Sequence, residues 1–219
     1  MEAEEVRYPY HSPISTLFGD SYELAKWLVR RMWDLHPQQA RFPDILKRRL
    51  IASYARRNHL RVFVESGTYL GETVAFMRRY CSWVYSVEFQ PHLARAAQSR
   101  FADDLRIRIV EGNSADWLPR IIAELKEPAL FWLDGHFAVG TARNGEIACP
   151  TMQELAAVLG DARFSHIVLV DDAREFRGQG GYPTLEALQR LIRELKPDVV
   201  VEVVHDIVRI THKSAEAAK

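Results

Sequence analysis

Two short acidic segments carry side chains suited to cation binding and proton transfer. LDGHF places Asp134 and His136 two residues apart, and VDDAREF places Asp171 and Asp172 side by side. Three carboxylates that converge cannot all stay ionised at neutral pH without a cation between them, because like charges raise one another's pKa. A hard divalent ion such as Mg²⁺ prefers oxygen ligands and leaves positions for water or a substrate. If the two segments follow neighbouring strands, Asp134, Asp171 and Asp172 are candidate ligands of such an ion.

A different segment, ESGTYLGET (65–73), resembles a turn that lets a ligand approach the backbone. Gly67 permits a tight turn, and Gly71 stands where the next helix is expected to begin. The spacing is not the G-x-G-x-x-G of dinucleotide enzymes, and a single acidic residue, Glu65, precedes it, which disfavours a nicotinamide cofactor. An alternative is that both glycines only form the turn between a strand and a helix.

Two further strand ends carry polar residues that could contact an adenosine group. Glu88 ends a strand pattern a little over 20 residues after Glu65, where an acid can accept hydrogen bonds from both ribose hydroxyls. The segment EGNSADW offers Asn113 and Ser114 to an adenine edge. Taken singly, Glu88 could be a solvated carboxylate and Ser114 a helix N-cap, so the order of these residues along the chain is the more specific feature.

Strand patterns and helix patterns alternate from residue 61 onward, and these elements must position the residues named above. Such alternation is typical of repeated βαβ units around a parallel sheet. Short apolar runs predict strands at 61–65, 83–88, 106–111, 129–134 and 166–171, and two strands joined by a short turn predict a closing antiparallel hairpin at 199–204 and 207–212. Helical patterns occupy 72–80, 92–101, 115–125, 152–159 and 185–195, with Ser114 as the expected cap of the third. The predicted fold is a doubly wound, seven-stranded, mostly parallel α/β sheet.

Residues 1–60 differ from the rest because they are rich in aromatic residues and carry two helical patterns, near 22–33 and 44–58. We interpret them as an N-terminal helical cap, followed by the main domain at 61–212 and a flexible tail at 213–219. The helices of the cap could also join two copies of the chain into a homo-oligomer.

The order of these motifs resembles that of class I S-adenosylmethionine-dependent methyltransferases, from residue 61 to about residue 212. The resemblance rests on ESGTYLG, SVE, EGNS and LDG, each following one of the first four strands. It implies S-adenosylmethionine as cofactor. The residues it places around that cofactor are Glu65, Gly67, Thr68, Gly71, Thr73, Glu88, Asn113, Ser114 and Asp134.

Within that class the acidic segments resemble those of metal-dependent O-methyltransferases of the macrocin type, which methylate sugar hydroxyls. The resemblance implies that Asp134, Asp171 and Asp172 hold Mg²⁺. The related pattern reads D-G-D after the fourth strand, whereas this chain has Asp134, Gly135 and His136. Because the second acid of that pattern is associated with proton removal, His136 becomes the candidate base, and the pKa of histidine suits the task. A histidine in a loop can equally be a surface residue.

The composition narrows the possible partners. Twenty-nine basic and 29 acidic side chains cancel, so no large net field draws the chain to nucleic acid or an anionic membrane, and a small-molecule substrate is expected. Two cysteines and the lack of a signal or membrane-spanning pattern predict a cytoplasmic enzyme. Arg143, Arg174 and Arg177 lie in the loops near the acids, and none of them is assigned a role.

Three other interpretations remain open at the level of sequence. Asp171 or Asp172 could hydrogen-bond the following turn while Asp134 only contacts a cofactor. The chain could bind S-adenosylmethionine without catalysis, as a partner subunit. It could also be a nucleotide-dependent oxidoreductase, although the dinucleotide fingerprint is missing.

Overall fold

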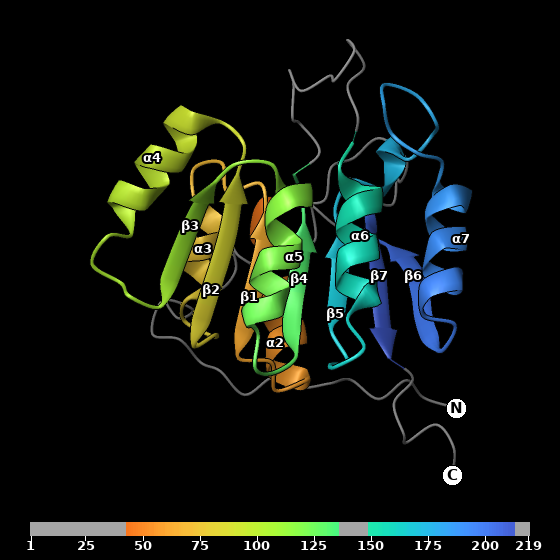
Figure 1. Ribbon diagram of the computed structural model, residues 1–219, viewed down its shortest axis with the longest axis horizontal. Helices are drawn as coiled ribbons and strands as arrows, with labels where there is room; N and C mark the ends of the chain where they lie inside the picture. The colour runs from red at the N-terminus through yellow and green to blue at the C-terminus, as the bar shows by residue number, and fades with distance from the viewer. Residues whose placement is uncertain (1–42, 136–148, 213–219) are drawn as a thin grey trace, which may run out of the picture. The chain divides into compact units, whose positions relative to one another are not determined.

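The computed structural model describes residues 43–135 and 149–212, and these residues build one seven-stranded sheet (Figure 1). The strands are β1 (Val62–Ser66), β2 (Trp83–Glu88), β3 (Ile107–Glu111), β4 (Ala129–Leu133), β5 (Ile167–Val170), β6 (Val199–Val204) and β7 (Ile207–His212). Their order across the sheet is β3-β2-β1-β4-β5-β7-β6. Strands β1 to β5 pair in parallel, and β7 pairs antiparallel with both β5 and β6. The predicted fold class is therefore confirmed.

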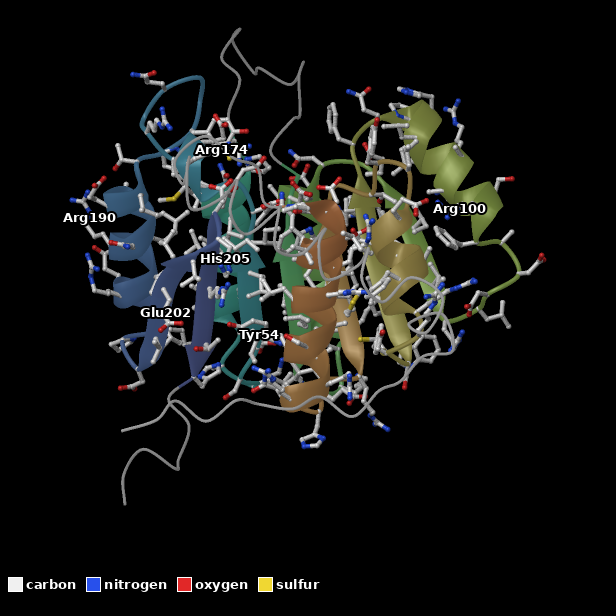
Figure 2. The ribbon with its side chains drawn as sticks, turned by 180° about the vertical axis from the view of Figure 1, so that it is seen from behind. Tyr54, Arg100, Arg174, Arg190, Glu202 and His205 are labelled. Carbon is white, nitrogen blue, oxygen red and sulfur yellow. The ribbon has the colours of Figure 1, made fainter. Side chains whose placement is uncertain are left out.

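Helices cover both faces of the sheet (Figures 1 and 2). The helices are α2 (Asp44–Arg57), α3 (Glu72–Met77), α4 (Pro91–Arg100), α5 (Ser114–Glu124), α6 (Thr151–Gly160) and α7 (Leu185–Leu195), with a short 3-10 helix, η1, at Ala173–Glu175. Helices α5, α6 and α7 pack on one face, and α2 and α3 pack on the other. None of the helices in the described ranges is long and apolar enough to cross a bilayer.

The central strands are continuous apolar runs because both of their faces are buried. In β4, all five residues of ALFWL are buried. Phe131 and Leu133 join the core under α5 to α7, while Leu130 and Trp132 join the core under α2 and α3. Neighbouring side chains of a strand alternate between the two cores, as the two-residue repeat of a strand requires.

Apart from the end of α3, the helix boundaries lie within one residue of the sequence prediction, and two of the differences have a clear cause. The side chain of Asn113 caps α5 by accepting a hydrogen bond from the backbone N–H of Ala115, so the prediction of Ser114 as cap is wrong and Ser114 is the first helical residue. Helix α3 ends at Met77, where residues up to 80 had been expected to be helical. The carbonyl of Met77 accepts from the N–H groups of Tyr80 and Cys81, which closes a turn and leads the chain directly into β2.

Helix α2 precedes the sheet in sequence and packs against it. Its predicted range, 44–58, agrees with the observed helix, and Ile51, Ala52 and Ala55 are buried in the same core as Trp132. The other predicted helix of the N-terminal segment, at 22–33, lies outside the described residues. The proposed division of the chain at residue 60, and the tail at 213–219, stay predictions.

Candidate functional site

The carboxyl ends of β1, β2, β4 and β5 share one edge of the sheet, and backbone hydrogen bonds continue just beyond the strands (Figure 1). The N–H of Asp134 donates to the carbonyl of Ser66 (3.1 Å), and the N–H of Asp171 donates to that of Leu133 (3.0 Å). The residues that follow β1, β4 and β5 are therefore held side by side. Ligands of open α/β sheets bind at this edge.

The turn after β1 passes very close to the loop after β4. Gly67 has a φ of +84°, and a Cβ atom added there would lie 2.7 Å from the carbonyl oxygen of Asp134. Gly71, with a φ of +75°, stands immediately before α3, and a Cβ atom there would lie 2.8 Å from the ring of Phe101. Gly67 therefore permits the approach of two loops at the candidate site, whereas Gly71 permits close packing against α4.

Glu65 is buried in the core below this turn. The hydroxyl of Ser86 donates to its Oε1 atom (2.7 Å), and Ser86 in turn lies 2.5 Å from the hydroxyl of Thr68. Burial raises the pKa of Glu65 well above its ordinary value, the hydrogen bond from Ser86 opposes this, and the charges of Asp134 and Glu88 raise the pKa further. Within the described residues, the Oε2 atom has no hydrogen-bond partner. Of the two threonines predicted to contact the cofactor, Thr68 shares a hydrogen bond with Ser86, and Thr73 is a half-buried residue of α3.

The Glu88 carboxylate, only 5% exposed, connects two loops. Its Oε2 atom accepts from the backbone N–H of Tyr69 (2.8 Å), and its Oε1 atom accepts from that of Gln90 (2.8 Å). Each oxygen keeps a second lone pair, so the predicted contact with ribose hydroxyls is compatible with this geometry. Glu88 is not the solvated strand-end carboxylate of the alternative interpretation.

Asn113 and Ser114 follow β3 at the same edge. The Oδ1 atom of Asn113 is occupied by the cap of α5, which leaves its amide group as the remaining donor. Ser114 is buried and lies near the carboxyl group of Glu154. Their predicted contact with an adenine edge stays a prediction.

The three predicted metal ligands converge. One carboxylate oxygen from each of Asp134, Asp171 and Asp172 lies within 4.8 Å of the other two. We call these three residues the carboxylate cluster. Asp172 has a φ of +51°, which is unfavourable for a residue other than glycine, and its side chain does not cap η1. Asp171 also bonds to its neighbour, because its Oδ1 atom accepts from the N–H of Asp172 (2.8 Å).

Two basic side chains that the sequence analysis did not assign reach the carboxylate cluster. The Nζ atom of Lys47, in α2, lies 2.5 Å from Oδ2 of Asp171 and 3.6 Å from Oδ1 of Asp172. Arg174 contacts the same oxygen of Asp172 at 3.0 Å and also pairs with Asp206 in the turn before β7. Figure 2 shows Arg174 beyond the carboxyl ends of the strands. Arg177 is exposed and donates to the carbonyl of Arg174, while Arg143 lies outside the described residues.

The carboxyl groups of the cluster influence one another. Burial raises the pKa of Asp134 well above its ordinary value, the charge of Asp171 adds to this, and the ammonium of Lys47 opposes it. Burial also raises the pKa of Asp171, against the lowering effect of Lys47. The expectation that the cluster holds a divalent ion stays a prediction. His136, the candidate base, lies outside the described residues.

One buried acid at this edge was not predicted from the sequence. Glu154 of α6 is fully buried, and its Oε1 atom would lie 3.5 Å from a Cβ atom on Gly135. The hydroxyls of Ser114 and Ser66 lie near enough to lower the pKa of Glu154, but burial outweighs them, and neither forms a hydrogen bond of good geometry with the carboxyl group. In sequence Glu154 looks like an ordinary first-turn glutamate, so nothing in MQELAAVL singles it out.

Comparison with solved structures identifies the fold. The O-methyltransferase of Bacillus cereus in complex with SAH is 16% identical, with a TM-score of 0.57 over 84% of this chain and 88% of that one. TomG, an O-methyltransferase of Streptomyces achromogenes involved in tomaymycin synthesis and solved with SAM, is 17% identical, with a TM-score of 0.57 over 84% and 86% of the two chains. The chain therefore has the class I methyltransferase fold.

The comparisons leave the reaction open. The N-methyltransferase NodS of Bradyrhizobium japonicum WM9 is 8% identical, with a TM-score of 0.53 over 78% of this chain and 97% of that one. Because O- and N-methyltransferases share the fold, the fold does not select the acceptor atom. No protein-family model and no curated protein matches the sequence.

Proposed function

We propose that the chain is an S-adenosylmethionine-dependent methyltransferase that transfers the methyl group to a hydroxyl oxygen of a small polar or glycosylated substrate. The observation that carries the proposal is the pair of buried carboxyl groups, Glu65 and Glu88, at the ends of β1 and β2. Neither forms an ion pair within residues 43–135 and 149–212. Buried carboxyl groups are costly without a cationic partner. S-adenosylmethionine would bring its cationic amino-acid part near Glu65 and its ribose hydroxyls to Glu88, so both carboxyl groups would gain a partner.

The other predicted cofactor residues surround this pair. Gly67 and Gly71 open the turn that would accept the amino-acid part, Glu88 would accept hydrogen bonds from the ribose, and Asn113 and Ser114 follow the next strand, where the adenine is expected. Catalysis then depends on alignment, because the sulfonium is already an activated methyl donor. The residues at β4 and β5 would orient the acceptor.

The carboxylate cluster fits a divalent ion in its donor type. Asp134, Asp171 and Asp172 offer hard oxygen atoms from two neighbouring strands. Mg²⁺ prefers such oxygen ligands, so these three residues would hold the ion. A bound ion would lower the pKa of a coordinated hydroxyl group. His136, two residues after Asp134, is proposed as the base that takes the hydroxyl proton.

The proposal is tested by cofactor binding and by the identity of the product. S-adenosylhomocysteine should raise the melting temperature, and NAD should not. With S-adenosylmethionine labelled in its methyl group, the label should appear on oxygen when hydroxylated glycosides and catechols are offered beside the matching amines. Label on the amines alone would contradict the choice of oxygen, and a lack of binding by either adenosine compound would contradict the whole proposal.

A further inference from the structure

Lys47 reaches the carboxylate cluster from a part of the chain remote in sequence. It lies 124 residues before Asp171, in the first turn of α2, and is 8% exposed. Ile51 and Ala55 follow at intervals of four residues, so Lys47 continues the buried stripe of this helix. Figure 2 shows α2 lying against the sheet. Because its apolar stripe is anchored in the core, α2 fixes the backbone position from which the side chain of Lys47 reaches Asp171.

Two basic side chains, Lys47 and Arg174, contact carboxyl groups of the cluster. Lys47 contacts both Asp171 and Asp172, whereas Arg174 is shared between Asp172, Asp206 and Glu175. Asp134 forms no ion pair within the described residues. Lys47 therefore neutralises only part of the cluster. It donates to Oδ2 of Asp171, and the N–H of Asp172 donates to Oδ1, so both oxygens of this proposed ligand already accept a hydrogen bond.

We propose that Lys47 is the internal counter-ion of the carboxylate cluster and competes with a divalent cation for Asp171. The inference rests on the proposed function, in which the cluster holds such a cation. An ammonium group at 2.5 Å from Oδ2 of Asp171 and a divalent ion on the same oxygen would repel each other strongly. The cation gains its full set of ligands only when the side chain of Lys47 swings away from Asp171.

The test measures Mn²⁺ binding by calorimetry and by electron paramagnetic resonance on the full chain. Lys47→Met removes the charge and keeps a long apolar stem, so this variant should bind Mn²⁺ about tenfold more tightly or better than the wild type. Lys47→Arg should stay close to the wild type. The matched control is Arg56→Met, which removes one charge from an exposed position of the same helix, nine residues or about 14 Å away, and should bind as the wild type does.

The wild-type protein gives a second measurement if Lys47→Met does not fold. Reductive methylation of Lys47, followed by mass spectrometry, should be slow without metal and faster once Mn²⁺ is bound. Equal Mn²⁺ affinities in wild type, Lys47→Met and Arg56→Met would overturn the inference, as would a labelling rate that does not respond to Mn²⁺ or a failure of every variant to bind it. S-adenosylhomocysteine is titrated into the same samples, so a failure of the proposed cofactor is detected separately.

Discussion

The carbonyl oxygen of Asp134 lies 2.7 Å from the position that a Cβ atom would take on Gly67. This contact joins the turn after β1, which carries the proposed cofactor residues, to the loop after β4, which carries the first acid of the carboxylate cluster. A side chain at Gly67 would have to push these two backbone segments apart, and it would also strain a φ of +84°.

Gly67→Ala should therefore destabilise the fold by about 1–3 kcal/mol and also weaken S-adenosylhomocysteine binding. The matched control is Gly160→Ala at the end of α6, where an added Cβ atom meets nothing within 4 Å, so stability should change little. Chemical denaturation and calorimetry measure both effects. Wild-type stability and affinity in Gly67→Ala would show that the two loops are not held as closely as the structure indicates.

Glu88→Ala should weaken S-adenosylhomocysteine binding by roughly 1–3 kcal/mol, the scale of lost hydrogen bonds to a charged acceptor. Part of the loss would come from release of the Tyr69 and Gln90 backbone groups that Glu88 now holds. Glu111→Ala is the control. Glu111 lies beside Glu88 in the register of β2 and β3, but its side chain is exposed. Equal affinities in calorimetry for both variants and the wild type would remove Glu88 from the cofactor site.

The sequence predicted the seven strands to within one residue at each end, because each strand is a short run rich in apolar residues between helical or turn patterns. It also predicted that Asp134, Asp171 and Asp172 converge, since these residues follow neighbouring strands. Both predictions depend on local patterns and on one topological rule.

The partners of these residues could not be predicted in the same way. Lys47 meets Asp171 across 124 residues, and its place in the buried stripe of α2 is visible only when the helix is docked on the sheet. Asn113 and Ser114 are both good caps, and the observed choice depends on where β3 stops relative to α5. Long-range packing decides each of these contacts.

Glu154→Gln should change how stability depends on pH. Burial raises the pKa of Glu154 above its ordinary value of 4.5, so the folded state holds the proton more tightly than the unfolded state does. The stabilisation from this group is complete below pH 4.5 and is lost as the pH rises through the folded pKa. The Gln variant lacks this loss, so its melting temperature should exceed that of the wild type increasingly as the pH rises. Parallel curves for the two proteins would contradict an elevated pKa.

Removal of divalent ions should abolish turnover and leave cofactor binding largely intact, because the carboxylate cluster and the Glu65 and Glu88 pair lie on different strands. Mg²⁺ or Mn²⁺ added after the chelator should restore the rate. Asp172→Asn, which removes one proposed ligand charge, should need more metal for the same rate. Full activity in chelator would defeat the proposed role of the metal while leaving the cofactor proposal standing.

His136→Ala should lower turnover about 10²- to 10⁴-fold with nearly unchanged cofactor affinity, as expected when a general base is lost. His136→Asp is the sharper variant, because it creates the D-G-D pattern of the related enzymes and supplies another proton acceptor two residues after Asp134. It should keep far more activity than the alanine variant. The limb of the pH–rate profile set by the base should also move to lower pH, since an aspartate titrates well below a histidine. Wild-type turnover of His136→Ala across this pH range would assign proton removal to another group.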